Sequence, residues 1–243
     1  MNILGMDSSG LVASAAVWSD DTILAEFTVN NKQTHSQTLL PMIDQVVTMS
    51  GKAIEDIDAI AVAAGPGSFT GLRIGSATAK GISLALKKPV IPVPTLEGMA
   101  YRVSISNGII CPMMDARRNQ VYTGIYAMEN GRLTVLKEQE AVDIHELIEQ
   151  LKEILQDEKY KDREVVFLGD GVPVQEAVLE KECTFSYQKA PAHLNRQSAA
   201  AVASLGAVYF AEGKAVEGKD HTPVYLRQSQ AERERAMREK EKQ

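Results

Sequence analysis

The densest group of residues that could do chemistry is a glycine-rich run, Gly65-Pro66-Gly67-Ser68-Phe69-Thr70-Gly71, between an apolar segment and a segment of helical periodicity. A glycine-rich turn that leads from a strand into a helix exposes backbone N–H groups, which can bind a phosphate. The spacing lacks the Gly-Lys-Ser/Thr of a Walker A loop and the third glycine of a dinucleotide fingerprint. Two interpretations stay open, an anion site and a tight structural turn.

Residue types that hold metals or act as nucleophiles are few and scattered. The histidines and cysteines are His35, His145, His193, His221, Cys111 and Cys183. None of them has a second Cys or His at the spacing of a zinc site, and the two cysteines do not make a disulfide framework. His35 could serve as a ligand or a base, although a single histidine at the start of a helix also suits a capping or surface role. We therefore predict no metal site.

The charge balance argues against a chain that binds nucleic acid by itself. The sequence has 26 Lys+Arg against 32 Asp+Glu, a net charge of −6, and a pI near 5.4. Binding to a phosphate backbone depends on clustered Lys and Arg. Arg117 and Arg118 could reach an acidic partner or a phosphate, or they could lie in a solvated hairpin turn. Any role with nucleic acid would need a partner.

The composition is that of an ordinary globular protein. The 243 residues are 44% hydrophobic and 24% charged, which excludes disordered and collagen-like classes. The first residues have neither the basic region nor the apolar run of a signal peptide, and no apolar stretch reaches membrane-spanning length. We expect a cytoplasmic protein with no membrane contact.

These residues must be positioned by an α/β framework, which is clearest in residues 1–105. Short β-rich runs and helical periodicity predict strands at 3–6, 13–18, 23–29, 59–64 and 90–93, and helices at about 36–47, 72–86 and 95–103. Ser36 is placed to cap the first helix. The strands come first as hairpins and then as crossovers, which predicts a mixed sheet with helices packed on it. This is the order of a ribonuclease-H-like domain.

A second, smaller unit is expected at 106–194. Strands are predicted at 109–114, 121–128, 133–138 and 164–168, with Asn130-Gly131 as a hairpin turn and an amphipathic helix at 144–155. Asn195 is predicted to open a small-residue helix that ends at Gly213, and we expect this helix, 195–213, to complete the first domain. Residues 226–243 form a charged run and are expected to be a solvated tail.

The predicted second helix is rich in small residues, including Gly75, Ala77, Ala79 and Gly81. Each glycine inside a helix costs about 1 kcal/mol relative to alanine, so a close helix contact should compensate for it. That contact could lie inside the monomer or at a subunit interface, and periodicity does not distinguish the two.

Four blocks of the sequence resemble the TsaB family, also called YeaZ. They are Ile3–Ser9, Thr34–Ile43, Gly65–Gly75 and Met114–Tyr122, and the likeness extends to Pro223–Arg227. The resemblance covers nearly the whole chain. It implies two actin-like ATPase domains of the sugar kinase, Hsp70 and actin superfamily (ASKHA), each with a ribonuclease-H-like core of mixed sheet flanked by helices. This agrees with the order of elements.

The resemblance also implies a function. TsaB-like proteins are required to form threonylcarbamoyladenosine at position 37 of tRNAs that read codons beginning with adenine. They act as partners of TsaD, the catalytic subunit that carries ATP and the metal, with TsaE as an ATPase and TsaC supplying threonylcarbamoyl-adenylate. The His-x-x-x-His metal motif of TsaD is absent from this sequence. The implied role is therefore a scaffold or activator without catalytic residues, which reaches tRNA only through the complex.

Several positions match the superfamily's phosphate loops. Asp7, with Ser8 and Ser9, stands where a carboxylate would face a metal–nucleotide complex, but no lysine or second carboxylate accompanies it. We expect at most a weak nucleotide site there, with a turn-stabilising Asp7 as the alternative. Gly169-Asp170-Gly171 resembles the second domain's loop or forms an ordinary left-handed turn. Gln120 stands where the family often has Glu.

The partner interface is predicted on the first two helices, which could meet a related pair from TsaD as a four-helix bundle, or from a second copy when TsaD is missing. Its expected residues are Leu39, Ile43, Val46, Val47, Arg73, Ala77, Lys80 and Gly81. Two other functions stay open. A small nucleotide-dependent kinase of the same superfamily lacks paired acids and phosphate-binding cations. A peptidase lacks His-Glu-x-x-His, Gly-x-Ser-x-Gly and an activated cysteine.

Overall fold

Continuous apolar runs place two strands at the centre of the first sheet. β1 (Asn2–Asp7) and β4 (Ala59–Ala63) are buried almost throughout and pair in parallel. The sheet is completed by β2 (Ala13–Ser19), β3 (Thr22–Val29) and β5 (Val90–Val93), in the order β3-β2-β1-β4-β5. The computed structural model describes residues 1–31, 34–104 and 107–227. The predicted mixed sheet is confirmed, with β3 as its exposed edge strand.

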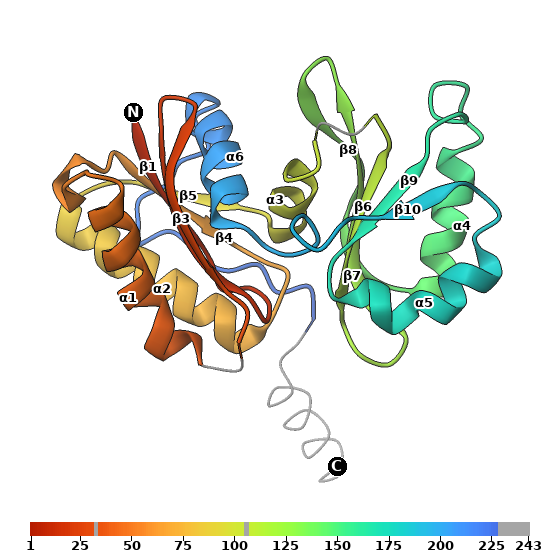
Figure 1. The fold of residues 1–243 in the computed structure, drawn as a ribbon, viewed down its shortest axis with the longest axis horizontal. Coiled ribbons are helices and arrows are strands. Elements are labelled where there is room, and N and C mark those ends of the chain that lie inside the picture. The colour runs from red at the N-terminus through yellow and green to blue at the C-terminus, as the bar shows by residue number, and fades with distance from the viewer. Residues whose placement is uncertain (32–33, 105–106, 228–243) are drawn as a thin grey trace, which may run out of the picture.

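A second five-stranded sheet lies beside the first and repeats its topology (Figure 1). Its strands are β6 (Ile109–Asp115), β7 (Gln120–Glu129), β8 (Arg132–Asp143), β9 (Val165–Leu168) and β10 (Tyr187–Lys189). The order is β10-β9-β6-β7-β8, with antiparallel β6-β7-β8 and parallel β6-β9-β10. Both units thus have the strand order of a ribonuclease-H-like core, in the mixed sheets flanked by helices that the fold class predicted.

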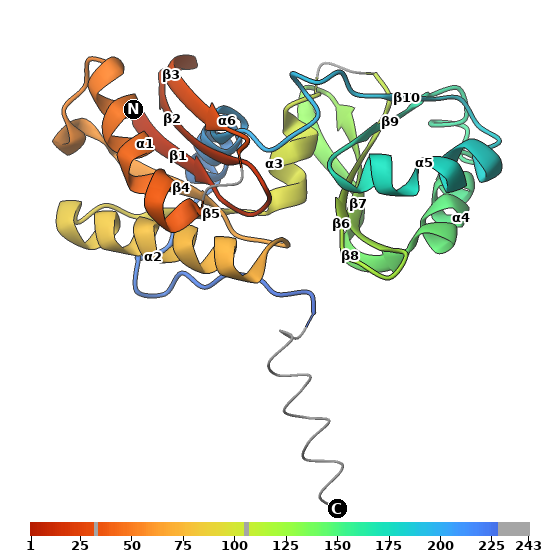
Figure 2. The same cartoon turned by 60° about the horizontal axis from the view of Figure 1, so that its bottom comes forward.

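Helices cover both faces of the first sheet. α1 (His35–Met49) and α2 (Phe69–Leu86) pack on one face, and α6 (Ala199–Ala211) packs on the other. Figure 2 shows α1 and α2 side by side and the chain after α6 running along α2. Because α6 returns from the second half of the chain, the first core contains residues from both ends of the described sequence.

α3 (Thr95–Tyr101) lies between the two sheets and joins them. Its buried side chains, Leu96, Met99 and Ala100, pack against the second sheet, and the helix also contacts α6. The outer face of the second sheet is covered by α4 (Ile144–Ile154) and α5 (Gly171–Glu182) (Figure 1). The interdomain connection is therefore a packed layer, and not a bare linker.

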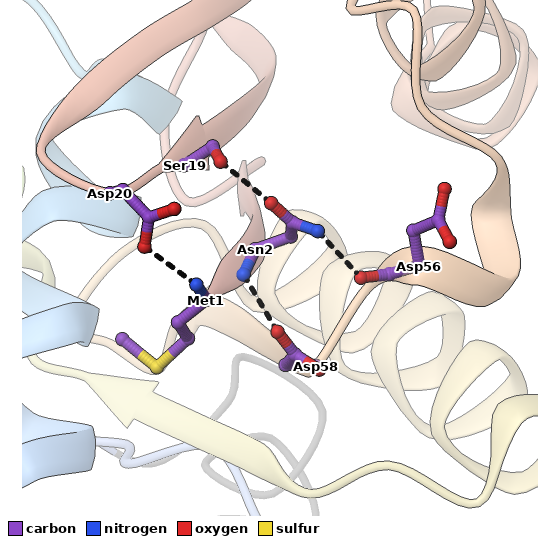
Figure 3. Close-up of polar contacts among 6 residues, drawn as sticks. All are labelled: Met1, Asn2, Ser19, Asp20, Asp56 and Asp58. Atoms are coloured by element: carbon purple, nitrogen blue, oxygen red, sulfur yellow. Dashed lines mark hydrogen bonds and ion pairs between the residues drawn. The ribbon is translucent and has the colours of Figure 1, made fainter.

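Polar contacts hold the start of the central strand β1 in place (Figure 3). The backbone N–H of Asn2 donates to Asp58 Oδ2 at 2.8 Å, and its side-chain amide donates to the Asp56 carbonyl at 2.8 Å. Ser19 Oγ donates to Asn2 Oδ1 at 2.7 Å. These bonds tie β1 to the end of β2 and to η1 (Ile54–Asp56), the short 3-10 helix before β4.

Some helix boundaries differ from the prediction. α1 begins at His35 with Thr34 at the N-cap position, so Ser36 lies inside the helix and does not cap it. α6 is capped by Ser198, whose Oγ accepts from Ala201 N, while Asn195 Oδ1 accepts from Gly169 N at 2.7 Å. The prediction that Asn195 opens the helix was wrong because its side chain is bound to another loop. η1, α5 and β10 were not predicted.

Candidate functional site

The turn after β1 is closed by Asp7. Its Oδ1 accepts hydrogen bonds from Ser9 N at 2.8 Å and from Ser9 Oγ at 2.6 Å. The Asp7 side chain is 1% exposed, and burial raises its pKa to about 6 even though the Ser9 bonds and nearby His35 lower it. Asp7 is thus a turn-stabilising carboxylate, the alternative left open by its sequence.

The glycine-rich loop Gly65–Gly71 covers this turn. Ser68 N donates to Ser9 O at 2.6 Å, and Ser8 Oγ donates to Gly71 O at 2.8 Å. A Cβ on Gly67 would overlap the Ser9 carbonyl oxygen, and one on Gly71 would overlap the Ser8 carbonyl oxygen. Only glycine permits such close backbone approach, so the motif acts as the tight structural turn.

The two halves of the chain meet at a cleft of about 730 Å³. His35 and Thr70 line it from the first half, and Asp115, Asp170 and Arg117 line it from the second. His35 Nε2 lies 2.8 Å from Gly10 O, and its Nδ1 has no partner among the described residues. Burial raises the pKa of Asp170, which accepts weakly from Asp115 N at 3.4 Å. Apolar and polar residues line the cleft together, with charged side chains of both signs.

The residues present do not fit the phosphate and metal of a bound nucleotide. Ser9 N is engaged by Asp7, and Ser8 and Ser9 are buried beneath the glycine-rich loop. Among the described residues, no three carboxylates, histidines or cysteines are grouped so that they could hold a metal. Gly169 has a positive φ, as predicted for a turn, and Asp170 then occupies the N-cap position of α5, which begins at Gly171.

Arg117, Arg118 and Asn119 form a strained turn, and Arg117 lines the cleft. All three have positive φ, at 65°, 58° and 59°. Arg117 N donates to Asp115 Oδ1 at 2.8 Å, and its side chain, 88% exposed, pairs with the same carboxylate at 3.7 Å. The two arginines thus lie in a hairpin turn, and left-handed backbone is costly for residues other than glycine.

The apolar side of α1 faces the core and not a partner. Leu39, Ile43, Val46 and Val47 have exposed fractions of 1%, 3%, 2% and 7% because they pack on the first sheet. Their helical periodicity reflects this burial. Leu39 and Val46, which were predicted in the interface, are covered by the sheet, whereas Ile43 and Val47 also line a groove between α1 and α2. The outer side of α1 instead exposes Leu40, at 59%, and Pro41.

The small residues of α2 divide between two faces. Gly71, Gly75, Ser76 and Ala79 are buried, and Gly75 lies against Ser8. Arg73, Ala77 and Gly81 are exposed, Lys80 is half-buried, and a Cβ on Gly81 would meet no atom within 4 Å. The contact inside the monomer, one of the two alternatives, is therefore present. The opposite side of the helix is exposed, and the contact at a subunit interface stays a prediction.

An apolar groove of about 460 Å³ lies between the outer sides of α1 and α2. It is lined by apolar residues and one carboxylate: Leu40, Pro41, Ile43, Val47, Ile54, Ile82 and Asp44. We call this groove, together with exposed Ala77 and Gly81, the helix face. Exposed apolar surface of this kind marks interaction sites.

The segment 214–227 was not foreseen as part of the site. Val216 pairs with Val90, Val224 N donates to Ala64 O at 2.7 Å, and the Tyr225 ring stacks on Phe69 at 4.2 Å between centroids. Arg73 also lies over the Phe69 ring, 4.3 Å from its centroid. Arg227 Nη1 donates to Ala116 O at 2.6 Å, which links this segment to the second half. Residues 228–243 of the predicted tail lie outside the described residues.

Comparison with known proteins gives concordant matches. The family described as TsaD, tRNA N6-adenosine threonylcarbamoyltransferase, matches residues 22–235. "tRNA threonylcarbamoyladenosine biosynthesis protein TsaB" of Escherichia coli (strain K12) is 34% identical over 237 residues, covering 95% of this chain and 96% of the relative. The protein of the same name from Bacillus subtilis (strain 168) is 36% identical over 180 residues, 74% of this chain and 76% of the relative.

A solved structure agrees with these matches. "YeaZ from Pseudomonas aeruginosa" superimposes with a TM-score of 0.75 at 25% identity, covering 93% of this chain and 99% of that one. In the described part of the chain, the helices are too short or too polar to cross a membrane.

Proposed function

The chain belongs to the TsaB family, and from this we propose that it takes part in tRNA threonylcarbamoyladenosine biosynthesis as a non-catalytic subunit that binds and activates a TsaD-like subunit. A TsaE-like ATPase joins the same complex in this proposal, and tRNA is reached through the complex. ATP and the metal are assigned to the TsaD-like partner.

Two features together carry the proposal. The helix face is exposed, and the polar groups of the turn at Asp7–Ser9, where the superfamily binds phosphate, are already bonded within the chain. The helix face offers exposed Leu40, Ala77 and Gly81 beside an apolar groove. Small residues let a partner helix approach closely, and the apolar groove supplies buried area. Meanwhile Asp7, Ser8 and Ser9 are occupied by contacts within the chain. These features support a binding role over a stand-alone kinase.

Binding is tested by changing Ala77→Trp and measuring affinity for the TsaD-like subunit by titration calorimetry. Overpacking an interface costs about 1–3 kcal/mol, which is roughly 5- to 150-fold in affinity. Val174→Trp is the matched control, since Val174 is an exposed residue of α5 on the second unit. Unchanged melting with lost binding supports the helix face. Normal binding by Ala77→Trp would contradict it.

The non-catalytic role is tested on the isolated chain. We expect no transfer of threonylcarbamoyl to tRNA from threonylcarbamoyl-adenylate, and weak or undetectable heat of binding with Mg-ATP. Tight Mg-ATP binding would favour the kinase interpretation.

A further inference from the structure

A hollow at the C-terminal end of α2 gathers lysines. Lys80, Lys87, Lys88 and Lys219 line a groove of about 560 Å³ with Leu84 and Glu217. We call it the lysine groove. Lysines of α2 and of the segment that follows α6 meet there because that segment runs along the helix (Figure 2). A basic concentration of this kind stands out on a chain with a net charge of −6.

Two of these lysines have no acidic partner among the described residues. Lys88 pairs with Asp58 at 3.8 Å, and Lys219 pairs with Glu217 at 2.6 Å. Lys80 Nζ donates to the Lys219 carbonyl at 3.5 Å, but within the part of the chain that the structure describes neither Lys80 nor Lys87 forms an ion pair. The groove therefore retains positive charge that its own carboxylates do not neutralise.

The groove is also apolar at its rim. Leu84 is 83% exposed and lies one helical turn beyond Lys80. Ala77, Lys80, Gly81 and Leu84 are spaced at three and four residues, so they share one side of α2. The lysine groove is thus continuous with the helix face, and the following inference rests on the proposed function of that face.

We infer that the lysine groove receives an acidic segment of the partner subunit, with carboxylates facing Lys80 and Lys87 and an apolar side chain covering Leu84. An RNA phosphate backbone fits less well. It would leave Leu84 uncovered, and Glu217 and Asp58 weaken the field that a polyanion would meet.

The basic charge of α2 also favours an acidic partner over a second copy of this chain. The charged residues of α2 are Arg73 and Lys80, with Lys87 as its cap, and the helix contains no acidic residue. The α2 helix of a second copy therefore supplies no carboxylate to Lys80 or Lys87. Like charges across an interface disfavour the wrong partner, so the same lysines favour the acidic one.

The test compares Lys80→Glu/Lys87→Glu with the matched control Lys161→Glu/Lys181→Glu, which makes the same charge change on the second unit. Lys161 and Lys181 are exposed there. Affinity for the TsaD-like subunit is measured between about 50 and 500 mM salt. Reversing two charges should weaken binding about 10-fold at low salt and flatten its salt dependence. The control should bind within about 2-fold of the parent chain, since an exposed charge changes affinity appreciably only where an opposite charge faces it.

Each outcome either supports or overturns the inference. Lys80→Gln/Lys87→Gln, which adds no new charge, should show a smaller loss in the same direction, and Lys80→Arg/Lys87→Arg should bind normally with parental melting. Salt-independent binding of the parent chain, or control-like binding by the Glu pair, overturns the inference while leaving the proposed function intact. Loss of tRNA retention with undiminished TsaD binding would overturn it in favour of RNA. If the parent chain fails to bind a TsaD-like subunit at all, the proposed function itself fails.

Discussion

At the scale of single residues, Asp7 is expected to make the stability of the fold depend on pH. Its pKa is raised to about 6 by burial, from an ordinary value of 3.8. The folded state then holds the proton more tightly than the unfolded state, so this stabilising contribution is present below about pH 4 and is lost as pH rises through 6. The shift of about two units corresponds to about 3 kcal/mol.

Asp7→Asn should remove this dependence, because Asn keeps an acceptor oxygen but cannot ionise. We expect the free energy of unfolding of the parent chain to fall by about 2–3 kcal/mol relative to Asp7→Asn between about pH 4 and pH 7.5. Urea unfolding of both chains at the two pH values checks this, with all other groups cancelling in the comparison. Parallel pH profiles would contradict the burial of an ionisable Asp7.

A substitution at Arg118 tests how much the left-handed backbone of its turn costs in stability. Its φ of 58° lies in the left-handed region, where a Cβ costs about 1 kcal/mol. Arg118→Gly should therefore raise the free energy of unfolding by about 0.5–1 kcal/mol, measured by chemical denaturation. A loss of stability would mean that the Arg118 side chain contributes more than its backbone strain costs.

At the scale of elements, adjacent leucines on α1 should separate stability from binding. Leu39 is 1% exposed in the core and Leu40 is 59% exposed in the apolar groove. Leu39→Ala should destabilise the chain by about 2–4 kcal/mol, because it leaves a cavity. Leu40→Ala should change the stability by less than about 0.5 kcal/mol and weaken binding of the TsaD-like subunit.

Thermal melts and titration calorimetry on both variants check this pair. The comparison is internally matched, since both changes remove the same atoms from neighbouring positions of one helix. Equal destabilisation by both would place Leu40 in the core, and unchanged affinity of Leu40→Ala would exclude it from the interface.

At the scale of the whole molecule, Arg227 links the two halves through Ala116 O. Arg227→Ala should lose this charge-assisted bond, costing about 1–2 kcal/mol, and release residues 114–122. Hydrogen exchange of that segment should quicken, while Arg118→Ala, which leaves the bond intact, should not change it. Unaltered exchange in Arg227→Ala would show that the bond does not restrain the turn.

The charge of the whole chain makes a further prediction about tRNA. With a net charge of −6, the isolated protein should bind tRNA with a Kd weaker than about 1 μM at physiological salt, and the binding should weaken steeply as salt rises. Filter binding over a salt series checks this. Tight binding at physiological salt would reveal a basic surface strong enough to act without a partner.

The sequence by itself determined most of the elements. Local patterns sufficed for β1–β9, for α1 to α4 and for α6, because their apolar spacing repeats with the period of the structure. It did not predict α5 or the three-residue β10. Gly171 and Pro173 occupy the first turn of α5, and its apolar residues give only a weak helical pattern. The family was also accessible, since the motif blocks are contiguous in sequence.

Only the tertiary structure decided which sides of these elements are free. Periodicity shows that Leu39, Ile43 and Val46 share a face, but the sheet beneath them decides that this face is buried. The same holds for Asp7, whose role depends on Ser9 and on a loop that is distant in the sequence. The lysine groove joins Lys80 to Lys219, so its charge exists only once the chain has folded. Contacts between residues distant in sequence leave no local pattern, and these contacts define the candidate site.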